Sequence, residues 1–134
     1  MIRSIIAVAA LPALPAWAAL TALHPRTRAD WRERWGLRVA PVQPGAVWIH
    51  AASAGEVRAA VALAHEIDGP VLLTADTDTG VVVARAAFGG RTLAVAAVRP
   101  VDHPWVLAPL WAEARPRALV FVEGAWWPQL ASLA

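Results

Sequence analysis

Four short apolar runs recur along the chain after residue 45, and roughly twenty residues separate one from the next. Each interval is long enough for a crossover helix, and the runs have the length of strands that are buried on both faces. The sequence therefore predicts parallel strands over Ala46–His50, Val71–Thr74, Thr92–Val98 and Ala118–Val122.

The intervals between these runs have helical patterns. After the first run, apolar residues recur at the spacing of one helix face: Val57, Ala60, Val61, Ala64 and Ile67. Further helices are expected over 79–88, over 104–114, where Pro109 either delays the start or kinks the helix, and from Trp126 to Leu133, as the opening of a fourth. Residues 46–134 thus predict an α/β fold, a Rossmann-like parallel sheet of about four strands with helices on both faces.

The first 24 residues predict an apolar membrane helix. No charge occurs from Ile5 to Leu23, and a helix of that length approaches the ~30 Å hydrocarbon core of a bilayer. A secretory signal peptide is the alternative, because Arg3 precedes the apolar stretch and Ala16-Trp17-Ala18 resembles a cleavage site. Five arginines follow the apolar stretch, which favours a domain on the cytoplasmic face of the membrane, beside anionic lipid head groups.

Residues 25–45 form a basic, proline-containing connector between the apolar segment and the first strand. Residues 30–36 predict a short amphipathic helix that ends at Gly36. The next glycine, Gly45, follows Pro44 and marks the end of the linker.

Composition narrows the functional classes. The 134 residues allow one compact domain, and the 58% share of hydrophobic residues exceeds the usual soluble range. All twelve basic residues are arginine and the net charge is only +2, so no polybasic nucleic-acid signature emerges. The chain has no cysteine, which excludes disulfides and a thiol nucleophile. No G-x-G-x-x-G or Walker A loop follows a predicted strand.

The exit of the first strand, residues 50–56, has three interpretations. Ser53 and Glu56 have the spacing of a helix capping box. Ala-Ala-Ser-Ala-Gly approximates a serine hydrolase elbow, although its leading glycine is missing and the only later Asp–His combination is Asp102-His103. Glu56 is also placed to act as a carboxylate base beside the cleft that forms beyond the carboxyl ends of strands. The motif alone does not choose between cap and base.

A second glutamate leaves the sheet after the fourth strand. Glu123 is expected either to face the same crevice or to cap the helix that begins near Trp126. Asp76 and Asp78 flank a Thr-rich turn that caps the second helix, and two acids at that spacing are weak grounds for a metal site. His50 and His103 are interpreted as ordinary polar residues at strand ends.

Taken together, these motifs resemble the ordered landmarks of the N-terminal domain of lipopolysaccharide Kdo (3-deoxy-D-manno-octulosonic acid) transferases. The resemblance covers essentially the whole chain, and its most specific part is the strand followed by H-A-x-S-x-G-E. The segments that carry it are Arg32–Gly36, Trp48–Glu56, Thr74–Gly80, Val101–Pro104 and Val122–Pro128.

The resemblance implies half of a two-domain GT-B enzyme that moves Kdo from CMP-Kdo to a lipid A precursor. It gives Glu56 the role of general base in an inverting transfer, and Glu123 that of a second essential acid. It places four further residues in acceptor-binding segments: Ser53, Gly55, Thr79 and Trp127. It implies no metal, no cofactor beyond the donor substrate, and no nucleic acid partner.

Two departures from the family pattern accompany this resemblance. Gly124-Ala125 stands where the family has Thr-Glu, so a second carboxylate is missing. The C-terminal domain that binds CMP-Kdo is expected to be absent from these residues, so the chain alone is expected to be inactive. The alternatives are the acceptor domain of another membrane-associated glycosyltransferase, or a non-catalytic, membrane-tethered truncated copy.

Overall fold

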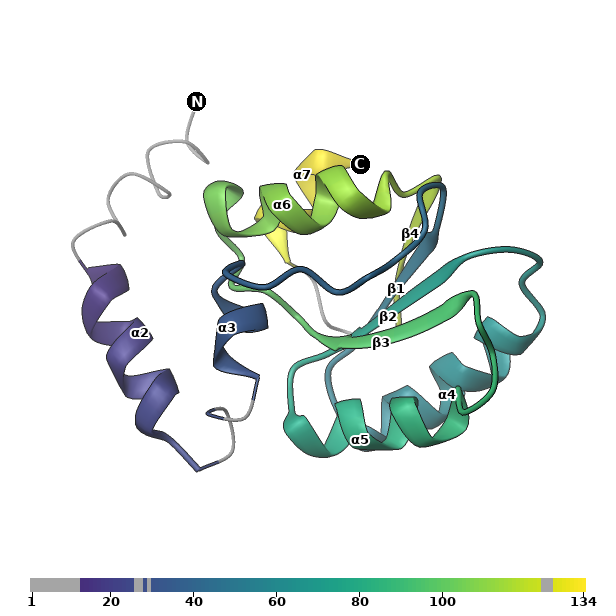
Figure 1. Ribbon diagram of the computed structural model, residues 1–134, viewed down its shortest axis with the longest axis horizontal. Coiled ribbons are helices and arrows are strands. Elements are labelled where there is room, and N and C mark those ends of the chain that lie inside the picture. Colours follow the sequence, from purple (N-terminus) through teal and green to yellow (C-terminus); the bar gives the residue numbers. More distant parts are fainter. Residues whose placement is uncertain (1–12, 26–27, 29, 124–126) are drawn as a thin grey trace.

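A computed structural model of the chain describes residues 13–25, 28, 30–123 and 127–134. The order of elements along the chain is helix, helix and then alternating strands and helices (Figure 1). Their bounds are α2 Leu14–Leu23, α3 Trp31–Arg34, β1 Val47–Ala51, α4 Ala54–His65, β2 Val71–Ala75, α5 Asp78–Ala87, β3 Ala94–Val98, α6 Pro104–Ala114, β4 Ala118–Phe121 and α7 Pro128–Leu133.

The four strands form one parallel sheet in the order β3-β2-β1-β4. The predicted α/β fold with about four parallel strands is therefore confirmed, with strand ends displaced by one or two residues. All residues of β1 and β2 are buried, as expected for central strands. The expectation of burial on both faces is wrong for β4, because it has only one neighbouring strand in the described sheet, and Ala118 is exposed.

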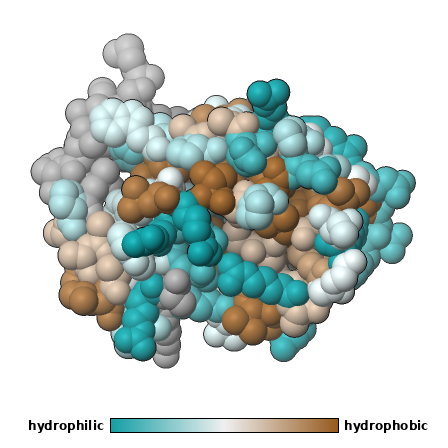
Figure 2. Space-filling view, in the orientation of Figure 1, coloured by the Kyte–Doolittle hydropathy of each residue, from teal (hydrophilic) through white to brown (hydrophobic). Residues whose placement is uncertain are grey.

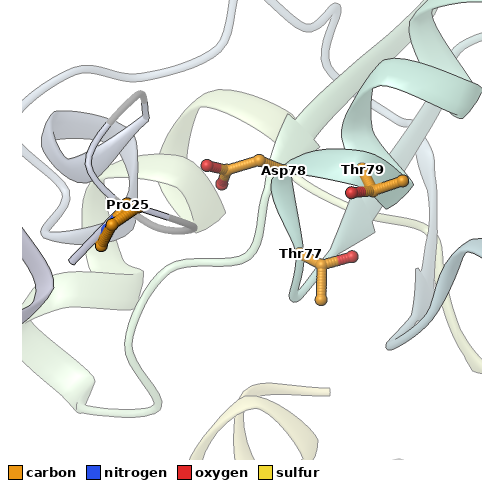
Figure 3. Close-up of a pocket in the computed structure, with 4 residues that line it drawn as sticks. All are labelled: Pro25, Thr77, Asp78 and Thr79. Carbon is orange, nitrogen blue, oxygen red and sulfur yellow. The ribbon is translucent and has the colours of Figure 1, made fainter.

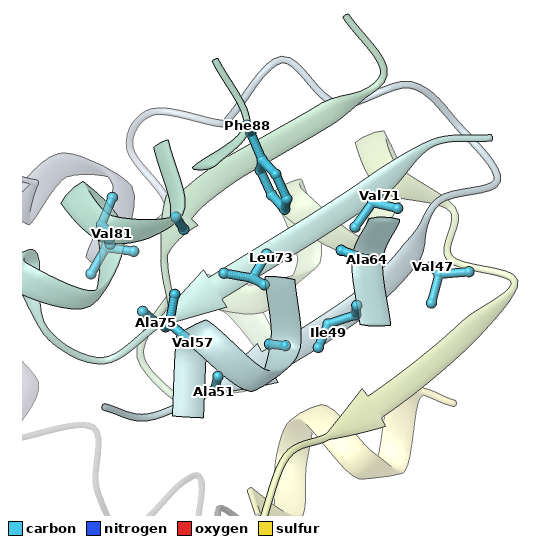
Figure 4. Close-up of a cluster of buried hydrophobic side chains, with 13 residues drawn as sticks. Val47, Ile49, Ala51, Val57, Ala64, Val71, Leu73, Ala75, Val81 and Phe88 are labelled. Atoms are coloured by element: carbon cyan, nitrogen blue, oxygen red, sulfur yellow. The ribbon is translucent and has the colours of Figure 1, made fainter. Parts of the chain in front are cut away.

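Alternate residues of each strand face opposite sides of the sheet and build two cores. Helices α4 and α5 cover one side, where Ile49 and Leu73 pack against Val57, Val81 and other apolar residues (Figure 4). Helices α6 and α7 cover the other side (Figure 1). The buried residues of that second core are Ala40, Val42, Ala46, Trp48, Leu72, Ala97, Leu107, Leu110, Ala114 and Leu130.

Helix α6 runs continuously from Pro104 to Ala114, with Pro109 inside it. Of the two alternatives for Pro109, a late start of the helix is therefore wrong. A start at Pro104 is favourable because the first N–H groups of a helix have no partner within it, so the N–H that proline lacks is not missed. The ring of His103 also caps the helix by accepting a hydrogen bond from the backbone N–H of Trp105. Helix α7 begins at Pro128, and Trp126, the expected start, lies outside the described residues.

The short helix expected over residues 30–36 is confirmed as α3, which ends at Arg34 and buries the charged Glu33 and Arg34. Gly36 follows it with φ of +68°, and a Cβ there would lie 2.6 Å from the carbonyl oxygen of Val106. Only glycine combines that left-handed backbone with so close an approach to α6. The connector is thereby held against the α6 side of the sheet.

Helix α2 is uncharged and exposes three large side chains, Trp17, Leu20 and Leu23. The indole of Trp35 donates a hydrogen bond to Thr21 over 2.8 Å, which joins α2 to the residue after α3.

Within the described parts of the chain, no helix has both the length and the apolar character needed to cross a membrane. Of the predicted span 5–23, residues 5–12 lie outside the described structure. On the side of the molecule shown in Figure 2, hydrophobic residues lie in separate patches among hydrophilic ones.

Candidate functional site

The strand order reverses its direction between β1 and β4. The connections from β1 to β2 and from β2 to β3 run in one direction across the sheet, and the chain then returns past β1 to form β4. Ligands of open α/β sheets bind beyond the carboxyl ends of the strands at such a reversal. The two exits that flank it are those after Ala51 and after Phe121, which carry the two predicted glutamates.

The turn between β1 and α4 brings Ser53 and Glu56 together. Ser53 is the N-cap of α4, and its hydroxyl oxygen accepts from the Glu56 N–H over 3.3 Å. The Glu56 carboxylate accepts from the Ala52 N–H at 2.8 Å and from the Ser53 hydroxyl at 2.9 Å. Both carboxylate oxygens are thus held at the helix N-terminus, where the helix dipole stabilises negative charge.

This geometry is a variant of the expected capping box. In the usual form the glutamate accepts from the N–H of the capping residue itself, whereas here it reaches the N–H of Ala52, one residue earlier. Glu56 remains half-buried rather than sealed in the core. The cap and a role as base are therefore compatible in one side chain, and the contacts within the turn do not separate them.

Gly55 lies in the first turn of α4 and is exposed. A Cβ at this position would meet only the Ser53 hydroxyl oxygen, at 3.8 Å. Packing within the described structure leaves room for a methyl group, so the turn itself does not require glycine. The small residue leaves the backbone at the start of α4 open to an approaching ligand.

Glu123 follows β4 in a left-handed conformation, with φ of +57°, and is exposed. The hypothesis that it caps the next helix is wrong, because Asp102 performs that task. The Asp102 carboxylate accepts from the N–H groups of Gln129 at 3.1 Å and Leu130 at 2.9 Å. Glu123 is thus left exposed at the exit of β4, the strand next to β1.

A buried hydrogen-bond network lies under the same exits, centred on His50. The His50 ring has no exposed surface, its Nδ1 lies 3.1 Å from the carbonyl oxygen of Thr74, and its Nε2 accepts from the indole of Trp127 at 3.0 Å. Burial lowers the pKa of His50 to about 4, although the nearby Asp76 opposes the shift. The imidazole is therefore neutral at physiological pH.

Trp127 is also covered by a cation. The guanidinium of Arg99 lies 3.5 Å from the centre of a Trp127 ring, and its Nε donates to Asp76 over 2.6 Å. Side chains at or after β1, β2 and β3 therefore hold Trp127, which follows β4 along the chain. The interpretation of His50 as an ordinary polar residue missed its role in holding Trp127. The signal for that role was a histidine within a run of otherwise apolar strand residues.

Comparison with known proteins places this arrangement in a family. Residues 29–134 match the family described as 3-deoxy-D-manno-octulosonic-acid transferase (kdotransferase). The chain belongs to the Kdo transferase family. It is 36% identical over 107 residues to a 3-deoxy-D-manno-octulosonic acid transferase of Bordetella pertussis, an alignment that covers 75% of this chain and 25% of that protein. The chain therefore spans about a quarter of the length of this Kdo transferase.

The Thr-rich turn after β2 lines a pocket in this Kdo transferase domain. The pocket has a volume of about 490 Å³ and is lined by Pro25, Thr77, Asp78 and Thr79 (Figure 3). Thr77, between the two expected acids, is the N-cap of α5 and accepts from the Gly80 N–H at 3.1 Å. Thr79 is exposed in this pocket, whose lining includes no residue of the Ser53–Glu56 turn.

Asp76 and Asp78 face different arginines rather than a shared ion. Asp76 binds Arg99, whereas Asp78 lies 3.9 Å from Arg34. Burial raises the pKa of Asp78, and the positive charge of Arg34 opposes that rise. Among the residues that the structure describes, no three acidic or histidine side chains come together as a metal site.

Among the described residues, no histidine lies beside Ser53 to support the hydrolase alternative. The Ser53 hydroxyl is bonded to Glu56, and the Nε2 lone pair of His50 is occupied by Trp127. The later pair, Asp102-His103, caps α7 and α6. A nucleophilic serine needs a histidine within hydrogen-bond reach, and the contacts described around Ser53 include none.

Proposed function

We propose that this chain is the acceptor-side domain of an inverting Kdo transferase of the GT-B type. The reaction would move Kdo from CMP-Kdo to a sugar hydroxyl of a lipid A precursor. The observation that carries the proposal is the Glu56 carboxylate, fixed by two hydrogen bonds at the carboxyl end of β1, where the strand order reverses, in a chain of this family. CMP-Kdo would be bound by a second domain outside these 134 residues.

Glu56 would act as the general base. A hydroxyl is a weak nucleophile, and a positioned carboxylate that takes its proton as the new bond forms typically contributes ~10²–10⁴-fold to the rate. The deprotonated acceptor oxygen bonds to the anomeric carbon of Kdo, the bond from that carbon to CMP breaks, and the configuration inverts. We assign no metal ion or other cofactor to this step.

The remaining predicted residues would bind the acceptor around this base. Ser53 and Gly55 lie in the turn that holds Glu56, and Thr79 and Trp127 lie at the exits of neighbouring strands. Glu123 would supply a second acid from the exit of β4. The missing carboxylate at Ala125 is compatible with Glu123 acting alone.

The test compares two variants that separate the cap from the base. The assay uses the 134 residues joined to the C-terminal domain of the Bordetella relative, with CMP-Kdo as donor and a lipid A precursor as acceptor. The 134 residues alone are expected to transfer no Kdo. Glu56→Gln keeps an acceptor for the Ala52 N–H, so it should melt close to wild type while losing ~10²–10⁴-fold in kcat. Ser53→Ala should lose about 1 kcal/mol of stability and keep measurable transfer.

If Glu56→Gln keeps near-normal transfer, Glu56 is a cap only and Glu123 becomes the next candidate base. If the joined wild-type protein transfers Kdo to another sugar acceptor and not to the lipid A precursor, the domain belongs to another glycosyltransferase. A folded joined protein that transfers nothing favours a non-catalytic copy.

We further propose that the domain is held at the cytoplasmic face of the inner membrane by its apolar N-terminal segment. The exposed Trp17, Leu20 and Leu23 of α2, followed by the arginine-rich connector, suit an apolar layer bounded by anionic head groups. Fractionation of a C-terminally tagged chain should recover it uncleaved in the inner membrane. A soluble periplasmic product lacking about the first eighteen residues would restore the signal-peptide interpretation.

A further inference from the structure

His50 contacts both ends of the segment that carries Glu123. Its backbone carbonyl accepts from the N–H of Val122 over 2.9 Å, and its ring Nε2 accepts from the indole N–H of Trp127 over 3.0 Å. Val122 immediately precedes Glu123, and Trp127 is followed at once by α7. One residue of β1 therefore fixes where the chain leaves β4 and where it enters the next helix.

The direction of the ring contact is determined by its partners. The carbonyl oxygen of Thr74 only accepts, so the His50 Nδ1 within 3.1 Å of it carries the hydrogen. The Nε2 then holds a lone pair, and the indole of Trp127, which only donates, meets it. The two neighbours thus select one tautomer and one orientation of a fully buried ring.

Trp127 is fixed on its face as well as at its edge. Arg99 stacks on its ring at 3.5 Å and is itself held by Asp76. Tilting the indole away from His50 would therefore disturb the stacked guanidinium and its carboxylate partner. This arrangement gives the segment from Val122 to Trp127 two fixed ends.

The same end of β1 also orients Glu56, because the Ala52 N–H holds one of its carboxylate oxygens. We propose that His50 is a positioning residue that sets the place of Glu123, after β4, relative to Glu56, after the neighbouring strand β1. This inference rests on the proposed function for the roles of the two acids. The statement that His50 holds Val122 and Trp127 does not depend on that function, because it rests only on the hydrogen bonds of His50.

Two substitutions of His50 separate its contacts. In His50→Gln the side-chain oxygen can take the place of Nε2 and accept from Trp127, whereas in His50→Asn the amide can reach Thr74 but is too short for Trp127. Amide and indole signals of the ¹⁵N-labelled 134-residue chain report the result. We expect His50→Asn to speed hydrogen exchange of the Trp127 indole and to shift the Glu123 amide, and His50→Gln to leave both close to wild type. An unchanged Glu123 amide in a folded His50→Asn variant would overturn the inference.

A pair of tryptophan variants tests the consequence for transfer in the joined enzyme. Trp127→Phe removes the indole donor to His50 but keeps a ring under Arg99. Trp35→Phe is the matched control, because it removes another half-buried indole donor, which bonds Thr21 Oγ1 at 2.8 Å. Both should melt lower than wild type. Only Trp127→Phe and His50→Asn should lower kcat, by roughly 10–10²-fold, since small misplacements of reacting groups cost that much.

The split between kcat and KM separates positioning from direct contact with the acceptor. For His50→Asn, whose side chain is fully buried and does not meet the acceptor, positioning predicts a fall in kcat with KM changed less than about threefold, because acceptor binding is kept while the acids are misaligned. A rise in the KM of His50→Asn alone, or an equal loss of kcat in Trp35→Phe, would contradict it. If the joined wild-type protein transfers nothing, the proposed function fails, and the indole and amide signals still decide the role of His50.

Discussion

The buried, neutral His50 should make the folded protein less stable in acid. The pKa of His50 is about 4 in the folded protein and near 6.5 in the unfolded chain. As the pH falls below 6.5 the unfolded chain takes up a proton that the folded chain resists until about pH 4, so this contribution to stability is complete above pH 6.5 and is lost between these values. At 1.36 kcal/mol for each pH unit between them, the loss is about 3 kcal/mol.

The assay is urea unfolding of wild type and His50→Gln at pH 7, 6, 5 and 4. Other groups titrate over this range, so the quantity of interest is the difference in unfolding free energy between the two proteins. That difference should shrink by about 3 kcal/mol from pH 7 to pH 4, because glutamine does not titrate. His65→Gln is the control, because it replaces an exposed histidine by glutamine. A difference that stays constant within about 0.5 kcal/mol would refute the reasoning, since His50 would then be protonated equally in both states.

Two further predictions concern single contacts. Gly36→Ala should lower the free energy of unfolding by about 2–4 kcal/mol, because of the left-handed backbone and the close approach to Val106. Its control, Gly45→Ala, has φ of +81° and no atom within 4 Å of the added Cβ, so it should cost about 1–2 kcal/mol. Equal losses in urea unfolding would show that the contact with α6 is not responsible. Asp102→Ala should cost about 1–2 kcal/mol by removing the cap of α7, and a thermal melt in which Glu123→Ala is the more destabilising variant would contradict this assignment.

The fold class could be predicted from the sequence because its signals are local. Apolar runs of strand length, a helical stripe such as Val57, Ala60 and Ala64, and intervals that fit crossovers specify parallel strands without any knowledge of distant contacts. The Ser53 cap of α4 was likewise visible, since capping joins residues within one helical turn.

The errors occurred where an interaction joins elements distant in sequence. Glu123 had the right position to cap α7, but Asp102, from the β3–α6 connection, is closer in space to that helix N-terminus. The exposure of β4 followed from its place at one side of the described sheet, which no property of Ala118–Phe121 reveals. The burial of the connector residues Ala40 and Val42 with Leu107 of α6 and Leu130 of α7 could likewise not be predicted from the local sequence.

The sequence by itself determined the parallel α/β fold, the first turn of α4 and the candidate base Glu56, because hydrophobic periodicity and caps depend on neighbours along the chain. Only the tertiary structure decided which strand exits meet. The order β3-β2-β1-β4 places the exit of β4 beside that of β1 and brings Trp127 to His50, 77 residues away. Local spacing carries no information about such pairs, because they form only when crossovers bring the carboxyl ends of the strands to one edge of the sheet.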